Sequence, residues 1–449
     1  MKSYVFTADH SGLPLATHLQ DGGENVTLVL IHPTRKNGKI ETPKTPEETK
    51  QVQDKVQYLN KNGNGLVKKM WATDAMGRIK KGDYVIFDQI YGWQYGDALY
   101  KRGVKVLGGS KTGFTLETER RKTLDMLKSM GYDMPFTKYL GPGSSKAAID
   151  FLKNAKDGML FCFKSDAPGV VTQVAHDSNE ELIKKITAEA KAIDADGCMF
   201  QEKIGGLEFN VETWYSNGKP VLANVDIEIK KKYNEMSEVQ TGCVADLVWV
   251  IPVDHPLRKR VNGPCDAFAK KYISSGRLDL SVIYDPHAEK MYPLEVCGDR
   301  PGYNQVFTLM EQLNMPIGEF HRDFLDGKYT GDIGAKCFKP GYGVSLRVFN
   351  DCSSKDQRID FPPELREHYW LWDNYLKGKN LMTTGGEHGE SVGVITASGE
   401  NPESAFAQLR KYYFKLNLTT KWCRDRFDED DDKNLPLARF HEMERLSLI

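Results

Sequence analysis

The chain has 449 residues, with 61 Lys or Arg against 62 Asp or Glu, so its formal net charge at pH 7 is −1. Such a balance excludes a broad basic surface for nucleic acid or an anionic membrane, although it leaves room for a local basic pocket. The length exceeds what one hydrophobic core usually organises, and we expect about two to four structural units.

The first hundred or so residues alternate strand-like and helix-like segments. Apolar runs rich in β-branched and aromatic residues lie at Ser3–Thr7, Val26–Ile31, Asp83–Asp88 and Val104–Leu107. This alternation predicts βαβ units around a parallel sheet. The polar, Lys-rich stretch Pro33–Lys69 predicts a solvated insertion or a surface helix.

The rest of the chain predicts a mixture of helices and strands. Helical spacing runs through Thr115–Met130, and apolar strand-like runs lie at Gly158–Lys164, Met199–Ile204, Glu208–Trp214 and Val221–Ile229. Two further strands and a helix predict a final α+β segment: Val344–Phe349, Ser391–Thr396 and Pro402–Leu416.

Cysteine usage and the chain start favour a cytoplasmic protein. The eight cysteines form no Cys-x-x-Cys pair, which argues against a zinc knuckle or a thioredoxin-like motif. Several, such as Cys162 between two phenylalanines, are typical of buried thiols in a reducing compartment. The first residues lack the apolar segment of a signal peptide, and the longest apolar stretch, 247–253, is too short to span a bilayer.

Two segments have residues suited to a nucleotide. Lys164 ends a strand and precedes a turn containing Gly169, so a cation and backbone N–H groups can meet phosphates there. The alternative for a lysine at a strand end is an ordinary surface residue. The strand at 199–202 runs into Gln201-Glu202-Lys203-Ile204, whose backbone edge can pair with adenine, and Glu208 can accept hydrogen bonds from ribose hydroxyls.

A predicted hairpin at 278–297 carries an acid on each strand. Asp279 lies on the first strand, and Glu295 shares a face of the second with Cys297. Two acids on neighbouring strands can hold Mg²⁺, which prefers carboxylates together with nucleotide phosphates. The alternative is an ordinary hairpin whose acids face water.

The order and spacing of these segments resemble the ATP-grasp superfamily and, more narrowly, the phosphoribosylamine–glycine ligases (glycinamide ribonucleotide synthetases). The resemblance covers nearly the full length. Lys164 falls on the lysine of the family's Val-Lys-Ala-Asp-Gly, Gln201-Glu202 on its Glu-Glu hinge, and Glu295-Val296-Cys297 on its Glu-Phe-Asn metal motif. Further similar segments are Asp83–Asp88, Gly96–Ser110, Leu116-Glu117, Met134–Tyr139, Gly206–Glu208, Gly385–Ala397 and Arg424-Asp425.

The resemblance implies a combined α/β and α+β architecture, the ATP-grasp fold. It places an N-terminal parallel-sheet (pre-ATP-grasp) domain at 1–115, the nucleotide-binding ATP-grasp domain at 116–335 and a C-terminal α+β domain at 336–449. It implies ATP as the nucleotide, with Mg²⁺ or Mn²⁺ as the metal ion.

The resemblance also implies roles for particular residues. It makes Asp279 and Glu295 metal ligands, Thr241 and Gly242 substrate contacts, and Asp226 and Arg300 catalytic residues. The implied ATP contacts are Arg120, Lys164, Gln201, Glu202, Lys203, Ile204 and Glu208.

Enzymes of this family phosphorylate a carboxylate with ATP, and an amine then attacks the acyl phosphate. The implied function is therefore an ATP-dependent carboxylate–amine ligase of purine biosynthesis that joins glycine to phosphoribosylamine and releases ADP and phosphate. Two alternatives stay open: a ligase for another small amino acid and amine, and a nucleotide-binding homologue that has lost catalysis.

The sequence departs from the family's pattern at four places. Arg120 replaces a lysine and keeps the charge with a different geometry. The glycine- and lysine-rich phosphate lid has become Ala167–Val171, which contains Pro168 and is stiffer and less cationic. Cys297 replaces the metal asparagine, although a thiol is a poor ligand for Mg²⁺. The substrate loop is reduced to Gln240–Ala245.

Overall fold

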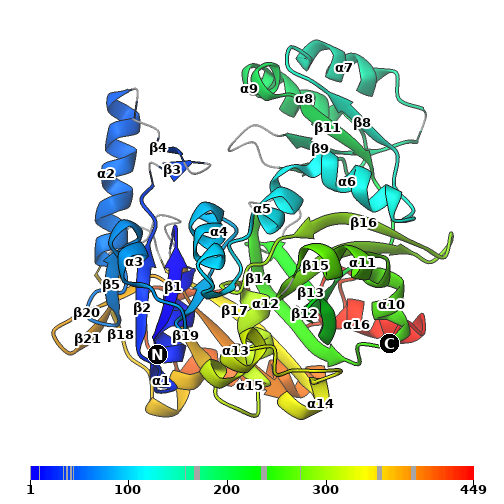
Figure 1. Cartoon of the computed structure of the whole chain (residues 1–449). Helices are drawn as coiled ribbons and strands as arrows, with labels where there is room; N and C mark the ends of the chain where they lie inside the picture. The colour runs from blue at the N-terminus through cyan, green and yellow to red at the C-terminus, as the bar shows by residue number, and fades with distance from the viewer. Residues whose placement is uncertain are drawn as a thin grey trace. The chain divides into compact units, whose positions relative to one another are not determined.

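The computed structural model of the chain describes residues 2–449 except 10, 34, 37–38, 41–42, 44, 157, 166–171, 234–239, 274, 351–355 and 386–390 (Figure 1). The chain forms two compact units. The first comprises Met1–Thr123, Phe209–Ser281 and Glu295–Ile449, and the second comprises Leu124–Glu208 and Val282–Leu294. The division into 1–115, 116–335 and 336–449 follows chain order and stays a prediction.

The predicted N-terminal parallel sheet is confirmed. Its five strands lie in the order β5-β2-β1-β6-β7, and each neighbouring pair is parallel. The strands are β1 (Ser3–Thr7), β2 (Val26–Leu30), β5 (Lys68–Trp71), β6 (Tyr84–Phe87) and β7 (Lys105–Leu107). Every residue of β1, β2 and β6 is buried, as expected for strands covered on both faces.

Helices connect and cover this sheet. They are α1 (Gly12–Asp21), α2 (Pro46–Lys61), α3 (Ala72–Arg78), α4 (Trp93–Lys101) and α5 (Lys111–Thr118), and a short pair, β3 (Arg35–Lys36) and β4 (Lys39–Ile40), precedes α2. Helix α2 is the predicted surface helix, with Leu59 as its buried residue. Its N-terminus is capped by Thr45, whose side chain accepts a hydrogen bond from the backbone N–H of Glu48.

The helical run predicted at Thr115–Met130 is two helices, because the chain leaves helical geometry between them. Glu119, which separates α5 from α6 (Arg120–Ser129), has φ −96° and ψ 58°. The Thr123 hydroxyl donates to the backbone carbonyl of Leu116 at 2.8 Å across this break. Periodicity of apolar residues continues through the break, which is why the sequence predicts one helix.

The larger sheet has nine strands in the described part of the chain. Its order is β16-β15-β12-β13-β14-β17-β22-β19, with β23 also paired to β17. The strands are β12 (Leu207–Ser216), β13 (Lys219–Lys231), β14 (Gln240–Ile251), β15 (Ser275–Asp285), β16 (Lys290–Cys297), β17 (Tyr342–Asn350), β19 (Tyr369–Leu371), β22 (Ser391–Gly399) and β23 (Lys421–Trp422). A separate small sheet contains β18 (Arg358–Ile359), β20 (Asn374–Lys377) and β21 (Asn380–Thr383).

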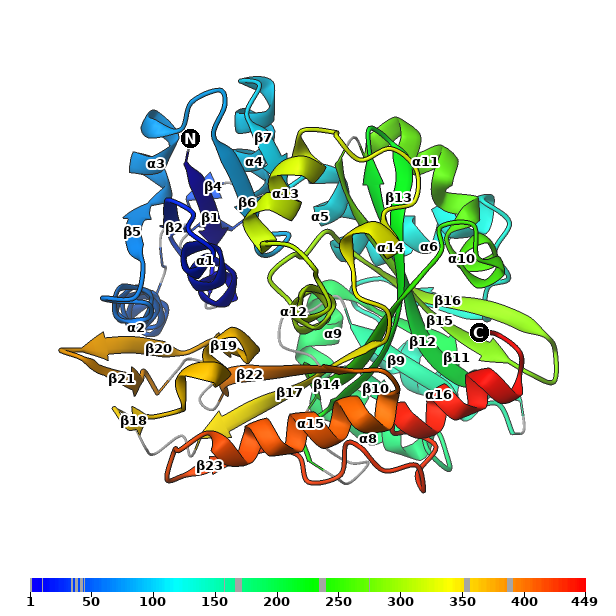
Figure 2. The ribbon, with the colours of Figure 1, turned by 90° about the horizontal axis from the view of Figure 1, so that it is seen from below.

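Different helices cover the two faces of this sheet (Figure 2). On one face, Thr308 of α12 (Asn304–Glu311) donates to Asp246 of β14 at 2.6 Å. On the other face, Trp249 packs edge-on against Phe440 of α16 (Pro436–Arg445), and α15 (Pro402–Lys415) follows β22. Because side chains alternate along a strand, the even-numbered positions of β14 face α12.

The face under α12 continues into an apolar core beside α13 (Ile317–Leu325). Trp214 of β12 is fully buried there, and its ring centroid lies 5.8 Å from Phe320 and 5.4 Å from Phe324. The remaining helices of the first unit are α10 (Pro256–Val261), α11 (Asp266–Tyr272) and α14 (Gly334–Cys337).

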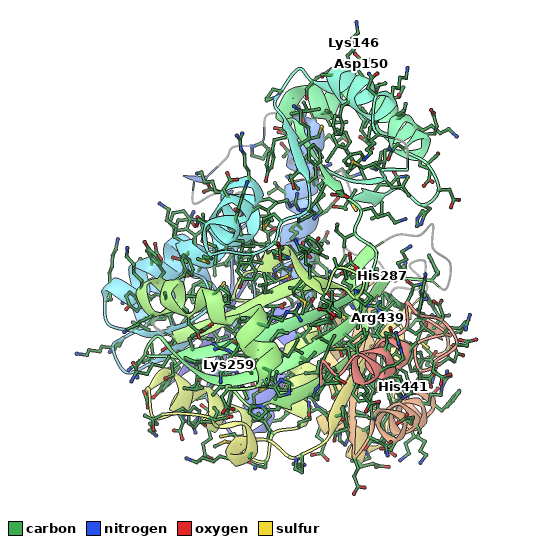
Figure 3. All side chains as sticks on the ribbon, turned by 90° about the vertical axis from the view of Figure 1, so that its right-hand side faces the viewer. Lys146, Asp150, Lys259, His287, Arg439 and His441 are labelled. Atoms are coloured by element: carbon green, nitrogen blue, oxygen red, sulfur yellow. The ribbon has the colours of Figure 1, made fainter. Side chains whose placement is uncertain are left out.

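The second unit is a small antiparallel sheet with helices. Its strands lie in the order β10-β9-β11-β8, namely β10 (Gln173–Val174), β9 (Phe161–Ser165), β11 (Cys198–Glu202) and β8 (Thr137–Leu140). Its core is aromatic and includes Phe161, Phe163 and Phe200. Its helices are α7 (Ser145–Lys153), α8 (Glu180–Ala188) and α9 (Ala190–Asp196), and Lys146 and Asp150 project from α7 (Figure 3).

Within the described residues, no helix combines the length and apolar character that crossing a membrane requires.

The packing of Trp214 predicts a large loss of stability in Trp214→Ala. We expect the free energy of unfolding to fall by about 3–5 kcal/mol, because the substitution leaves a cavity against α13. Urea unfolding followed by circular dichroism measures it. The matched control is Phe414→Ala, since Phe414 is 73% exposed and its loss is expected to change the free energy by less than about 0.5 kcal/mol. Equal effects of the two substitutions would contradict this assignment of the core.

Candidate functional site

The second unit brings together two of the predicted nucleotide contacts. Lys164 on β9 and Gln201 on β11 lie on adjacent antiparallel strands, and the Lys164 Nζ donates to the Gln201 Oε1 at 3.0 Å. Both side chains are buried, and the Gln201 Nε2 has no hydrogen-bond partner among the described residues. An unpaired buried donor beside a lysine is typical of a place where a polar ligand completes the hydrogen bonding.

The predicted hinge follows directly. The backbone N–H of Glu202 donates to the Phe136 carbonyl at 2.8 Å, and that of Lys203 donates to the Leu160 carbonyl at 2.8 Å. Burial raises the pKa of the nearby Cys162 thiol, and the charges of Lys164, Lys203 and Glu208 also act on it. The charged groups of Lys164, Lys203 and Glu208 therefore lie around the Cys162 thiol beside the hinge. Ile204 follows Lys203 in the chain.

Gly206 fixes the path of the chain between the hinge and Glu208. Its φ is +148°, which L side chains rarely adopt, and a Cβ there would overlap the backbone carbonyl of Tyr284. The absence of a side chain at Gly206 lets the backbone pass close to Tyr284 of β15 before it enters β12, the strand that carries Glu208.

Arg120 lies in the first turn of α6, in the first unit. The predicted lid, residues 167–171, lies outside the described residues, as does most of 234–240 before the substrate loop. The phosphate-binding role of residues 167–171, and their closeness to Lys164, therefore stay predictions.

The first unit brings the predicted metal ligands Asp279 and Glu295 to one place. Burial next to both carboxylates raises the pKa of the Cys297 thiol well above its ordinary value of 9.0. The Lys230 ammonium lies 3.3 Å from a Glu295 carboxylate oxygen and 3.1 Å from one of Glu228. Cys297 is therefore a neutral thiol beside the two acids, and a neutral thiol is unsuited to Mg²⁺.

Asp279 and Glu295 nevertheless fit a nucleotide-bound metal ion. Asp279 is fully buried, its Oδ2 accepts from Gln305 at 3.4 Å, and its Oδ1 has no hydrogen-bond partner among the described residues. No group of three or more His, Cys, Asp or Glu side chains with metal-holding geometry occurs in the part of the chain that the structure describes. Mg²⁺ commonly takes one or two protein carboxylates and completes its shell with phosphate and water, so a two-carboxylate site suffices.

A wider layer of buried acids extends along the sheet beneath α12. We call Glu212, Asp226, Glu228, Asp246 and Asp279 the carboxylate layer; all five are buried. Asn210 donates to Asp226 and to Glu228, at 3.3 Å each. Strand register aligns them, because Asn210 faces Asp226 across β12 and β13, and Glu228 faces Asp246 across β13 and β14.

Crowding in this layer favours the neutral acids. Burial raises the pKa of Asp226 well above 3.8, and repulsion from Asp246 and Glu228 adds to the shift. Burial also raises the pKa of Asp246 to about 6, although hydrogen bonds from Thr308 and Ser345 oppose the shift. The pKa of Asp279 is raised by burial and by Glu212, while Arg277 acts in the opposite direction.

One strong ion pair lies within the layer. The Arg277 Nη1 lies 2.7 Å from a Glu212 oxygen, and both side chains are almost fully buried. Arg277 also donates to the backbone carbonyl of Arg300 at 3.2 Å. This pairing connects β12, β15 and the segment that carries Arg300.

Arg300 and the predicted substrate contacts meet at Tyr303. Arg300 is ion-paired with Glu117 of α5, and its guanidinium lies 5.7 Å from the Tyr303 ring centre. The Tyr303 hydroxyl occupies the space that a Cβ at Gly242 would need, and Gly242 has φ +86°. The backbone carbonyl of Thr241 accepts from Arg347 at 3.3 Å. In this form the charge of Arg300 is balanced by Glu117.

A second acidic place lies at the carboxyl ends of β1 and β6. These neighbouring strands form the switch point of the parallel sheet. On one side of β1 lie β2 and β5, and on its other side lie β6 and then β7. Ligands of open α/β sheets bind in the crevice at such a point. The Ser11 hydroxyl oxygen lies 2.8 Å from carboxylate oxygens of both Asp9 and Asp88.

Ser11 lies between the two acids, and its hydroxyl oxygen is at donor distance from both carboxylates. Burial raises the pKa of Asp88 well above 3.8, the charge of Asp9 adds to the shift, and hydrogen bonds from Thr7 and Ser11 oppose it. The net shift favours a proton on Asp88.

Sequence reasoning missed the Arg277–Glu212 ion pair, the Glu117–Arg300 ion pair and the Asp9–Ser11–Asp88 cluster. The carboxylate layer had a readable signal: polar residues at every second position of otherwise apolar strands, in Asn210-x-Glu212, Asn224-x-Asp226-x-Glu228 and Arg277-x-Asp279-x-Ser281. Glu117 and Arg300 are separated by 183 positions, and no local pattern connects them.

No family model matches the sequence. A similar curated protein is the carbamoyl phosphate synthase large chain of Clostridium acetobutylicum, which is 25% identical over 349 residues. The match covers 76% of this chain and 29% of that enzyme, so the chain spans less than a third of its relative's length.

Two solved structures resemble the chain over most of its length. Phosphoribosylamine–glycine ligase from Thermotoga maritima has a TM-score of 0.63 at 17% identity, covering 94% of this chain and 99% of that one. The biotin carboxylase domain of 2-oxoglutarate carboxylase from Hydrogenobacter thermophilus, solved with MgADP, ADP and bicarbonate, has a TM-score of 0.60 at 11% identity, covering 99% and 98%. At these identities the likeness establishes the fold.

The raised pKa of Asp88 predicts how stability depends on pH. Folded Asp88 keeps a proton that the unfolded chain loses above pH 3.8, so this contribution is complete below pH 3.8 and is lost as pH rises through the higher folded pKa. The substitution Asp88→Asn removes this titrating group. We therefore expect the free energy of unfolding of the variant to rise relative to that of wild type between pH 5 and pH 7.5. The expected rise is about 1.4 kcal/mol for each pH unit of this range that lies below the folded pKa of Asp88 and above its unfolded value.

Urea unfolding at the two pH values measures the difference. The control is Asp125→Asn, because Asp125 is an exposed residue of α6 and its replacement is expected to change the free energy of unfolding by less than about 0.5 kcal/mol. A parallel pH response of wild type and Asp88→Asn would show that Asp88 is ionised in the folded protein.

Proposed function

Because the chain has the ATP-grasp fold, we propose that it is an ATP-dependent ligase that joins a carboxylate to an amine and releases ADP and phosphate. The observation that carries the proposal is the pair Asp279 and Glu295: a buried Asp279 oxygen has no hydrogen-bond partner among the described residues, and Glu295 lies with Asp279 beside the Cys297 thiol. Lys164 and Gln201, whose amide Nε2 has no hydrogen-bond partner among the described residues, support nucleotide binding by the second unit.

The proposed reaction has two steps. A carboxylate oxygen of the first substrate attacks the γ-phosphorus of ATP, the bond to the β,γ-bridging oxygen breaks, and ADP leaves with that electron pair. The amine nitrogen then attacks the carbonyl carbon of the acyl phosphate. A C–N bond forms, the C–O bond to phosphate breaks, phosphate leaves with the electron pair, and the amine loses its proton to a base or to water.

We propose that residues of the second unit, together with Arg120, contact the nucleotide. Gln201, Glu202, Lys203 and Ile204 form the adenine hinge, and Glu208 accepts from ribose hydroxyls. Lys164 and Arg120 are the phosphate cations, and two arginine- or lysine-type charges suit the negative charge of a triphosphate.

Asp279 and Glu295 are the residues that would hold Mg²⁺, or Mn²⁺ in its place. When bound, the ion would neutralise phosphate charge and polarise the γ-phosphoryl group. Arg300 and Asp226 are the proposed catalytic residues, and Thr241 and Gly242 the proposed substrate contacts. Arg300 pairs with Glu117 through its Nε and Nη2. We propose that the other N–H groups of the guanidinium meet the transferring phosphoryl group.

The substrate pair has two versions. Glycine with phosphoribosylamine, as in purine biosynthesis, is supported by the sequence resemblance and by the likeness to the Thermotoga maritima enzyme. Another small amino acid and amine are supported by the shortened substrate loop at 240–245. A second class, a nucleotide-binding protein without turnover, is favoured by the neutral Cys297 thiol at the metal position.

Glu295→Gln tests the ligase proposal. We expect ADP release from MgATP, with a panel of amino acids and amines, to fall at least about 100-fold in this variant, because stabilisation by a metal ion is worth several kcal/mol. A coupled pyruvate kinase and lactate dehydrogenase assay measures the rate. Glu400→Gln is the control, since Glu400 is exposed on a turn after β22.

Binding of a fluorescent ATP analogue separates the two classes. Lys164→Met should weaken nucleotide binding, whereas Glu295→Gln measured without metal should leave it unchanged. Nucleotide binding without ADP release under any substrate pairing would rule out the ligase and support the non-catalytic homologue.

A further inference from the structure

Arg347 of β17 is a buried cation without a counter-ion. Its side chain is 7% exposed, and no carboxylate in the part of the chain that the structure describes forms an ion pair with it. Two other buried arginines of the first unit are paired, Arg258 with Asp266 and Arg277 with Glu212. A buried charge is costly without an opposite charge, so an anion beside Arg347 would be stabilised.

The neighbouring acid of the carboxylate layer does not balance this charge. Asp246 lies opposite Ser345, two positions before Arg347 on β17. Its Oδ1 accepts from the Thr308 hydroxyl at 2.6 Å, and its Oδ2 accepts from the Cys243 thiol at 3.6 Å. Neutral donors therefore satisfy the Asp246 carboxylate, and it forms no ion pair with the guanidinium among the described residues.

The Arg347 guanidinium also has unused N–H groups. Its Nη1 donates to the backbone carbonyl of Thr241 at 3.3 Å, and its Nη2 donates to the Asn304 Oδ1 at 3.0 Å. Its Nε has no hydrogen-bond partner among the described residues. A guanidinium carries more N–H donors than these two bonds use, and such donors suit the paired oxygens of a carboxylate or a phosphate.

The predicted substrate contacts lie beside this guanidinium. Thr241 accepts from it, and at the adjacent Gly242 the Tyr303 hydroxyl occupies the space of the absent Cβ. Burial raises the pKa of Tyr303, and the charges of Arg347 and Arg300 both oppose the shift, so both guanidinium groups lie near this phenol. Thr241, Gly242 and Tyr303 are each half-buried, so an anion can approach Arg347 from their side.

We infer that Arg347, together with the Tyr303 hydroxyl, binds an oxyanion that a substrate carries, either a carboxylate or a phosphate monoester. This inference rests on the proposed function, in which Thr241 and Gly242 are the substrate contacts. Arg347 orients the substrate and takes no proton, since a guanidinium stays charged in proteins.

Thermal unfolding of the full chain, without nucleotide or metal, tests oxyanion binding. The probes are inorganic phosphate and acetate, compared with sodium chloride at equal ionic strength. We expect at least one probe to raise the melting temperature by about 2 °C or more, because an anion that binds only the folded protein stabilises it. A larger shift with phosphate identifies a phosphate monoester, and a larger shift with acetate identifies a carboxylate. No shift with either probe would overturn the inference.

Substitutions locate the site. Arg347→Gln should lose the shift, because a neutral amide has no charge to attract the anion. Arg347→Lys should keep part of it, since the charge remains without the planar fork. Two controls should respond as wild type does: Arg358→Gln, at an exposed arginine of β18, and Lys164→Met, which removes a proposed phosphate contact of ATP. Wild-type shifts in both Arg347 variants, or loss of the shift in Lys164→Met alone, would overturn the inference.

Steady-state kinetics of ADP release separates this inference from the proposed function. With the panel of amino acids and amines, Arg347→Gln should raise the KM of one substrate at least about tenfold and leave the KM of ATP unchanged. Unchanged KM values, or a higher KM for ATP alone, would overturn the inference and leave the ligase intact. Shifts that depend on Arg347, without ADP release under any substrate pairing, would overturn the ligase and leave Arg347 as an oxyanion-binding residue.

Discussion

The buried ion pair between Arg277 and Glu212 is the interaction on which the first unit depends. It joins β15 to β12 at 2.7 Å, and the same guanidinium donates to the backbone carbonyl of Arg300. Two residues further, the Gly302 N–H donates to the Asp88 carbonyl at the end of β6. One buried charge thus sets the position of the segment that runs between the two sheets. A buried pair of this kind is costly to break, because either partner alone would be an uncompensated charge.

The same pair leaves the rest of the carboxylate layer short of positive charge. Arg277 neutralises Glu212. Burial raises the pKa values of the remaining acids Asp226, Asp246 and Asp279, which favours their protonated forms. α12 supplies hydroxyl and amide donors through Thr308 and Gln305, which satisfy some carboxylate oxygens without adding charge. Protonated acids and neutral donors therefore take the place of counter-ions in this layer. Asp279 belongs both to the layer and to the proposed metal site, so the packing of the sheet bears directly on the metal chemistry that we propose.

Local chemistry explains which parts of the fold were predictable. The buried runs at β1, β2 and β6 are continuous apolar segments separated by helical ones, and such alternation specifies a parallel sheet. Lys164 and Gln201 were predicted as parts of one nucleotide site, and they meet because β9 and β11 are adjacent antiparallel strands. The break at Glu119 was not predicted, since apolar spacing continues through it. The roles of these residues stay predictions until they are tested.

The sequence by itself determined the types of element, their order and the fold, because hydrophobic periodicity and turn residues act over a few neighbouring positions. It also supplied the acids Asp279 and Glu295 on consecutive strands. Only the tertiary structure decided what these acids meet: Cys297 as a neutral thiol, Lys230 as a counter-ion, and Arg300 held by Glu117. Charge balance in a buried layer depends on side chains from strands and helices far apart in the chain, and no local pattern encodes their distances.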